Sequence, residues 1–102
     1  MTDEAALKAL EWLEAHRGMP VTAAWYVERG ARIVQAVPPK PASVEPGSEG
    51  KWLVVYGDGM MRILDRREFA LFTVVVDEQR LVIEYGRRHG NRRFVLEARY
   101  RL

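Results

Sequence analysis

The chain has 102 residues, of which 48% are hydrophobic, so it is long enough for one domain with a modest core. The absence of cysteine excludes disulfides and thiolate metal sites. No apolar run approaches the roughly 20 residues that span a bilayer, and the acidic N-terminus is unlike a secretory signal. We therefore expect a cytoplasmic protein with no membrane partner. The net charge of +2 is too small to identify a partner.

The first segment is amphipathic and predicts a helix over about 3–17. Its polar side includes Glu4 and Lys8, a favourable pair four residues apart. Gly18 can adopt the left-handed conformation that ends a helix, and Pro20 prevents its continuation. The apolar stripe that should face the core consists of Ala6, Leu7, Leu10, Trp12 and Leu13.

The next segment, residues 21–37, has two interpretations. Apolar and polar residues alternate over 21–29, as in a strand that turns at Gly30. The same residues could instead form a short helix that begins at Thr22 and ends at Gly30. The β-rich composition favours strands, and residues 33–37 are expected to form a strand in either case.

Residues 38–50 contain four of the five prolines and two glycines. The run from Pro38 to Pro41 favours an extended polyproline conformation. We therefore expect a proline-rich surface loop within the single domain of residues 1–102, either mobile or in contact with a partner.

The most apolar stretch, residues 51–76, predicts a strand, a tight turn, a second strand, one helical turn and a third strand. Residues 52–56 show no polar alternation, so we expect them to be buried on both faces or packed under something. The Gly-Asp-Gly sequence at 57–59 suits a hairpin turn. Asp65 and Glu68 are spaced as a capping box for the helical turn.

The last segment predicts a hairpin whose second strand has the clearest alternation in the chain. From Phe94 to Leu102 every second residue is apolar, so this strand should have one buried and one wet face. Residues 81–85 should form the first strand, with Tyr85 in the core. Residues 86–91 form a polar loop between the two.

These elements together predict an α+β fold made of sequential hairpins. The helix at about 3–17 should pack on a strongly bent antiparallel sheet, or on a small SH3-like β-barrel, of about six strands.

The segment over about 46–76 combines a Pro46-Gly47 turn, the aromatic strand 52–56, the Gly-Asp-Gly turn, Ile63, and Phe69 after a short polar turn. In this order of features it resembles small phage and prophage proteins of the PGDYG type. It departs from them at residues 48–51, where that family has an aspartate directly before the aromatic strand. The resemblance implies a phage or mobile-element origin and a small β-rich fold. Because the function of that family is unknown, it implies no catalytic residue.

Residues of catalytic types are present, but not in catalytic patterns. Ser43 and Ser48 lie in the proline-rich segment with no histidine nearby in sequence, and the Gly-Asp-Gly turn lacks the lysine of a phosphate-binding loop. Asp58, Asp65 and Glu68 are better explained by turn and cap chemistry than as metal ligands. We expect a protein that is not an enzyme and has no cofactor, metal or small-molecule substrate.

Positive charge gathers near the C-terminus, where residues 80–102 contain seven arginines and two glutamates. Arginine makes up 13 of the 16 basic residues, and guanidinium groups bind phosphates and carboxylates bidentately. A GC-rich genome would give the same bias. The candidate partner-binding residues are Arg87, Arg88, His89, Asn91, Arg92, Arg93, Arg99 and Arg101.

Three functions are compatible with these features. The first is a small phage- or mobile-element-type protein that binds and modulates a host protein. The second is nucleic-acid binding through the arginine-rich hairpin, although such proteins usually carry a larger net charge. The third is a homo-oligomeric structural component, for instance of a virion.

Overall fold

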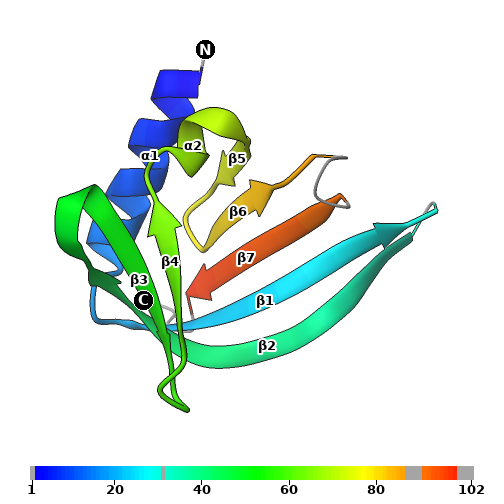
Figure 1. Cartoon of the computed structure of the whole chain (residues 1–102), viewed down its shortest axis with the longest axis horizontal. Helices are drawn as coiled ribbons and strands as arrows, with labels where there is room; N and C mark the ends of the chain where they lie inside the picture. Colours follow the sequence, from blue (N-terminus) through cyan, green and yellow to red (C-terminus); the bar gives the residue numbers. More distant parts are fainter. Residues whose placement is uncertain (1, 31, 87–90, 99–102) are drawn as a thin grey trace.

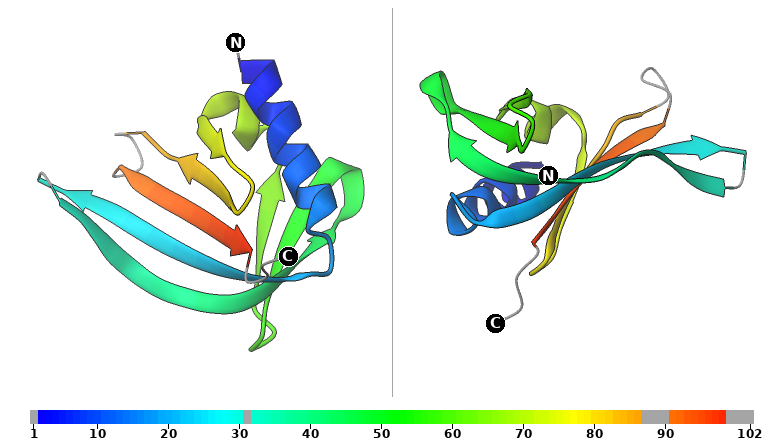
Figure 2. Two further views of the ribbon diagram at one scale, coloured as in Figure 1. Left: turned by 180° about the vertical axis from the view of Figure 1, so that it is seen from behind. Right: turned by 90° about the horizontal axis from the view of Figure 1, so that it is seen from below.

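The computed structural model describes residues 2–30, 32–86 and 91–98. One helix packs against an antiparallel sheet that curls into a half-barrel (Figures 1 and 2). The strand order is β4-β3-β2-β1-β7-β6-β5. The elements are α1 (Thr2–Ala15), β1 (Pro20–Arg29), β2 (Arg32–Pro46), a 3-10 turn η1 (Ser48–Gly50), β3 (Lys51–Tyr56), β4 (Met61–Asp65), α2 (Glu68–Leu71), β5 (Thr73–Val76), β6 (Arg80–Glu84) and β7 (Arg92–Ala98).

The predicted N-terminal helix is confirmed, with one error in its apolar stripe. Trp12 and Leu13 are buried, and Gly18 ends the turn after the helix with φ +73°. Leu7, however, is 57% exposed. The buried stripe is centred on Ala9 and Leu13, and Leu7 lies outside it on the helix surface.

Residues 21–29 form a strand, so the helical interpretation of this segment is wrong. β1 is an inner strand that pairs with β2 on one side and with β7 on the other. Val21 and Ala23 are buried. Over residues 21–27, β1 therefore has a strand neighbour on each side for its backbone hydrogen bonds, apart from the register shift at Ala24.

The predicted loop at 38–50 is wrong over residues 38–46, because β2 continues through the prolines to Pro46, and only residues 47–50 connect β2 to β3 outside a strand. Two features make this possible. Pro38 and Pro39 lie at a register shift where they oppose the single residue Ala24 of β1. In addition, β3 pairs with β2 only from Ala42 onward. Pro41 takes part on that side through its carbonyl oxygen, which accepts the N–H of Gly57, so its missing N–H leaves no ladder bond unmade there.

The β3–β4 hairpin is confirmed, but the expectation of burial on both faces of its first strand is not met. Gly59 has φ +90° and its N–H donates to Tyr56 O, which closes the turn. Trp52 and Val54 are buried on the inner face. Leu53 and Val55 point to the outer face and are only partly covered.

Between β4 and β5 the chain makes the predicted helical turn, α2, which buries Phe69 completely. The cap differs in detail from the predicted capping box. Asp65 Oδ1 accepts the N–H of Arg67, 3.0 Å away, rather than that of Glu68. The Asp65 side chain therefore stabilises the turn that precedes α2 and does not cap the N–H of Glu68 inside the helix.

The C-terminal hairpin confirms the alternation seen in the sequence. Phe94 and Leu96 of β7 are fully buried, and Tyr85, just after β6, is 8% exposed and belongs to the core. The core lies on the inner side of the curled sheet, where Leu13 of α1 and Phe69 of α2 meet the strands.

Candidate functional site

Three of the eight residues predicted for partner binding fall within the described ranges. Asn91 directly precedes β7, and Arg92 and Arg93 are its first two residues. The other predicted site residues, Arg87, Arg88, His89, Arg99 and Arg101, lie outside the described residues.

Arg93 belongs to an ordered row on the outer face of the sheet. It lies opposite Tyr26 of β1 and Glu84 of β6. Its Nε is 3.7 Å from Glu84 Oε1, and the two side chains are 39% and 37% exposed. An exposed pair of this kind contributes only about 0–1 kcal/mol to stability. It does offset the charge that Arg93 could offer to a partner.

Asn91 connects the β6–β7 loop to the β1–β2 turn. It has φ +48°, a left-handed conformation that asparagine tolerates better than most residues. Its carbonyl oxygen accepts the N–H of Glu28, 3.1 Å away, and its own N–H donates to Gly86 O. Two turns that are far apart in the sequence are thereby joined at one end of the sheet.

The β1–β2 turn adds two arginines that are not among the predicted site residues. Arg29 and Arg32 lie opposite each other across this turn, and both are exposed. Arg92 pairs with Val27, two residues before Arg29 on β1. Figure 1 shows the β1–β2 turn and the start of β7 on the same side of the molecule. The basic end is defined as Arg29, Arg32, Asn91 and Arg92.

Ion pairing separates the basic end from the remaining surface. Of the nine arginines in the described ranges, five have an acidic partner within 4.0 Å. Arg29, Arg32 and Arg92 have no ion-pair partner among the described residues, and elsewhere in those ranges the same holds for Arg66. The end stays positive when the neighbouring Glu28 is included. The five paired arginines are Arg17, Arg62, Arg67, Arg80 and Arg93.

Arg62 lies in a contrasting environment on the inner side of the sheet. Its guanidinium carbon is 4.7 Å from the ring centres of both Trp25 and Phe94. One of its terminal nitrogens donates to the Tyr85 hydroxyl over 2.5 Å. Cation–π contacts are worth about 0.5–2 kcal/mol each, most where water is excluded. Arg62 thus links the edge strand β4 to strands on the opposite side of the half-barrel.

Glu68 completes this inner cluster. Its Oε1 is 4.0 Å from the nearest Arg62 nitrogen, and both side chains are 25% exposed. Burial raises the pKa of Glu68 above its ordinary value, and the Arg62 charge opposes that rise. Burial likewise raises the pKa of Tyr85. Arg62 Nε and Glu68 Oε2 are buried without a hydrogen-bond partner in the described structure.

The acidic residues that could have formed a metal site are used in turns. Asp58 Oδ1 accepts the N–H of Met60 over 2.9 Å. The Arg67 guanidinium, 2.9 Å from Asp65, lowers the pKa of that carboxyl to about 2. Across residues 2–30, 32–86 and 91–98, no three His, Asp or Glu side chains are grouped as metal ligands would be. His16 Nδ1 donates to Trp12 O over 2.7 Å at the end of α1.

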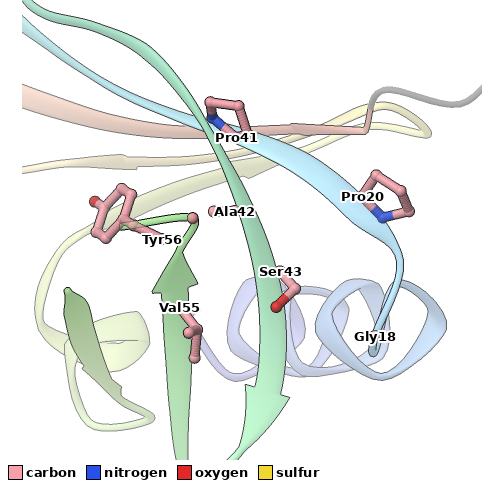
Figure 3. Close-up of a pocket in the computed structure, with 8 residues that line it drawn as sticks. Gly18, Pro20, Pro41, Ala42, Ser43, Val55 and Tyr56 are labelled. Carbon is pink, nitrogen blue, oxygen red and sulfur yellow. The ribbon is translucent and has the colours of Figure 1, made fainter. Parts of the chain in front are cut away.

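An open apolar depression of about 350 Å³ lies where β1, β2 and β3 run side by side (Figure 3). Pro20, Ser43 and Val55, which succeed one another across the three strands, form part of its lining. Gly18, Pro41, Ala42, Tyr56 and Gly57 complete it. Burial raises the pKa of the Tyr56 phenol at its rim.

No family model, curated protein or solved structure is significantly similar to this chain. Among the helices of the described residues, none combines the length and apolarity needed to cross a membrane.

Proposed function

We propose that this protein is a small, non-catalytic protein-binding module whose basic end docks on an acidic surface of another protein. In line with the resemblance to phage proteins, the partner is a host protein whose activity the binding modulates. One observation carries the proposal: among the described residues, three of the four arginines without an ion-pair partner lie where two turns meet, while the other five have an acidic neighbour.

Carboxylates suit this end as ligands because Arg29 and Arg32 project from a two-stranded ribbon that extends beyond β7. Guanidinium groups in such a place are hydrated, rotate freely and form bidentate contacts with carboxylates at small desolvation cost. The chain as a whole carries a net charge of only +2, which fits a local acidic patch better than a long polyanion.

A comparative pull-down tests the proposal. Immobilised wild-type protein and the R29E/R32E/R92E variant are exposed to the same bacterial lysate. We expect a stoichiometric partner that the wild type retains and the variant loses. Arg66→Glu is the matched control, because Arg66 is also unpaired among the described residues but lies outside the basic end, and it should retain the partner. Failure to capture any stoichiometric partner, or equal capture by all three proteins, would contradict the proposal.

Nucleic-acid binding is the second candidate function, and the β1–β2 ribbon is the observation that favours it. A two-stranded ribbon fits the major groove of DNA, and Arg29 and Arg32 lie at its tip. Fluorescence anisotropy with a labelled DNA duplex at low salt tests it. Binding that weakens with salt and with R29E/R32E/R92E would support this function, whereas absence of binding would eliminate it.

Self-association into a structural assembly is the third candidate, and light scattering at high protein concentration tests it. We further propose that the half-barrel belongs to the SH3-like class of small barrels and that the protein acts in the cytoplasm. The lack of cysteine supports that location, because cytosolic proteins seldom depend on disulfides.

A further inference from the structure

The face of the sheet that carries the core continues beyond the core to the basic end. β1 pairs with β7 without a register shift from Val21 to Val27. Because alternate residues of a strand share one face, Val27 lies on the same face as Trp25, which packs against the core. Arg92 pairs with Val27, just as the fully buried Phe94 pairs with Trp25. The inner face of the sheet therefore extends into the basic end.

The three arginines of the basic end all lie on this inner face. Arg29 is two residues beyond Val27 on β1, and it pairs with Arg32 of β2. Arg92 lies beside Val27 on β7. Glu28, the acidic residue next to them in β1, alternates to the outer face. Within the described part of the basic end, the three positive charges therefore share the inner face without a carboxylate.

Two apolar side chains lie among these arginines. Val27 pairs with Val34 of β2, so the two valines continue the row that begins with Arg92 on β7. Val34 is 42% exposed although it is apolar. The next row on the same face, about 7 Å further along the strands, consists of Arg29 and Arg32. The inner face therefore presents an exposed apolar patch with guanidinium groups on two sides.

The outer face of the same strands has a different character. Ile33, which is 51% exposed, pairs with Glu28. Nearer the body of the protein, the charge of Arg93 is offset by Glu84. An acidic partner would thus meet negative or neutralised charge on the outer face and free positive charge on the inner one. Complementary charge selects the inner face.

Building on the function proposed above, we propose that this inner face binds a segment of the partner protein in which acidic residues flank an apolar one. The apolar side chain covers Val27 and Val34, and the carboxylates pair with the surrounding guanidinium groups. Alternate side chains of an extended segment are also about 7 Å apart, so an acidic residue two positions from the apolar one reaches Arg29 and Arg32. Water excluded from above the valines strengthens these ion pairs.

The valines favour a protein segment over a polyanion. A row of phosphates would pair with the arginines but leave Val27 and Val34 exposed. A second copy of this chain offers a poorer ligand. Its exposed Leu7 has acidic neighbours on α1, but the charge of one of them, Glu4, is offset by Lys8, 3.6 Å away. The site therefore suits a foreign segment best.

The test uses the full chain and two capped peptides of equal charge, Glu-Glu-Leu-Glu-Glu and Glu-Glu-Ser-Glu-Glu. Binding at low salt is followed by NMR of the valine and isoleucine methyl groups. We expect the leucine peptide to bind at least fivefold more tightly than the serine peptide and to shift the methyl signals of Val27 and Val34. The methyl signals of Ile33, on the outer face, should move little.

Three variants separate the apolar patch from the arginines. Val34→Ser, at an exposed position, should bind the two peptides equally, whereas R29E/R32E should lose both. Ile33→Ser is the matched control on the opposite face and should keep the preference for leucine. The pull-down with R29E/R32E/R92E reports on the function of the basic end separately.

Equal binding of the two peptides to the wild type would overturn the proposal, and so would shifts at Ile33 in place of Val34. The function of the basic end would still stand in either case if the pull-down succeeds. Absence of saturable binding of the leucine peptide at millimolar concentration would overturn the proposal as well. Self-association of the wild type in light scattering, abolished by Leu7→Ser, would assign the site to a second copy and overturn it too.

Discussion

The two ends of the β1–β2 pair differ in what surrounds them. Near Pro20 and Ser43 the pair lies within the body of the protein, with β7 and β3 on either side and α1 packed close by. Near Arg29 and Arg32 it extends past β7 as a two-stranded ribbon whose described side chains are exposed. Packing against neighbouring elements therefore dominates at the first end, and exposed charged side chains dominate at the second.

We therefore expect the part of β1 and β2 inside the body to stabilise the fold, and the part at the basic end to bind a partner. Substitutions in the body should change the free energy of unfolding and leave binding specificity alone. Substitutions of Arg29, Arg32 or Arg92 should change binding and leave the free energy of unfolding nearly unaltered, because no described contact there depends on these side chains.

The largest effect is expected at Phe94, which is fully buried and contacts Trp25. Phe94→Ala should lower the free energy of unfolding by about 3–5 kcal/mol, because it leaves a cavity in the core. Urea denaturation measures the loss. The matched control is Val95→Ala on the neighbouring, partly exposed position, which should cost clearly less. Equal costs would show that the inner face is not the core.

The next effect is expected at Arg62. Arg62→Met keeps the aliphatic bulk but removes the contacts with the rings of Trp25 and Phe94 and leaves Glu68 without its cation. We expect a loss of about 1–3 kcal/mol. Arg66→Met, in which an exposed arginine is changed, should stay within about 0.5 kcal/mol. If Arg62→Met left the free energy of unfolding unchanged, the contacts of Arg62 with Trp25, Phe94 and Glu68 would not stabilise the half-barrel.

Much of the body could be predicted from the sequence, because its patterns are local. The helix stripe, the glycine after it and the alternation of β7 depend on neighbours a few residues away. The loop predicted from the prolines of β2 was wrong for a physical reason. A strand tolerates proline where the neighbouring strand is missing or the register shifts, and both conditions depend on tertiary pairing.

The candidate site was predicted only in part, for the same reason. Arg92 lies in a visible basic run, but Arg29 and Arg32 join it only because β1 pairs with β7 and Asn91 bonds to Glu28. The role of Arg62 required the curvature of the sheet, which brings β4 across to the aromatic residues of β1 and β7. No spacing in the sequence signals either arrangement.

A smaller, pH-dependent effect is expected at Asp65, whose pKa is lowered to about 2 from an ordinary 3.8 by Arg67. A lowered carboxyl pKa means that the folded state binds the proton less tightly than the unfolded state. The resulting stability is fully present above pH 3.8 and is lost as the pH falls through 2. The difference in urea midpoint between wild type and Asp65→Asn should therefore shrink as the pH falls. A constant difference would contradict the assignment.

The smallest effect on stability is expected at the basic end. R29E/R32E should change the free energy of unfolding by no more than about 0.5 kcal/mol, because both side chains are exposed and have no ion-pair partner in the described residues. Thermal denaturation checks this. A substantial loss would show that these arginines stabilise the fold and would undermine their use as a free binding surface.

The most direct test of the basic end observes the guanidinium groups themselves. Poly-glutamate is titrated into the protein, and the Nε–H signals of the arginines are followed by NMR. We predict large, saturable and salt-sensitive shifts for Arg29, Arg32 and Arg92, and small shifts for the paired Arg17, Arg67 and Arg80. Shifts of equal size for all the arginines, or none at the basic end, would contradict this prediction.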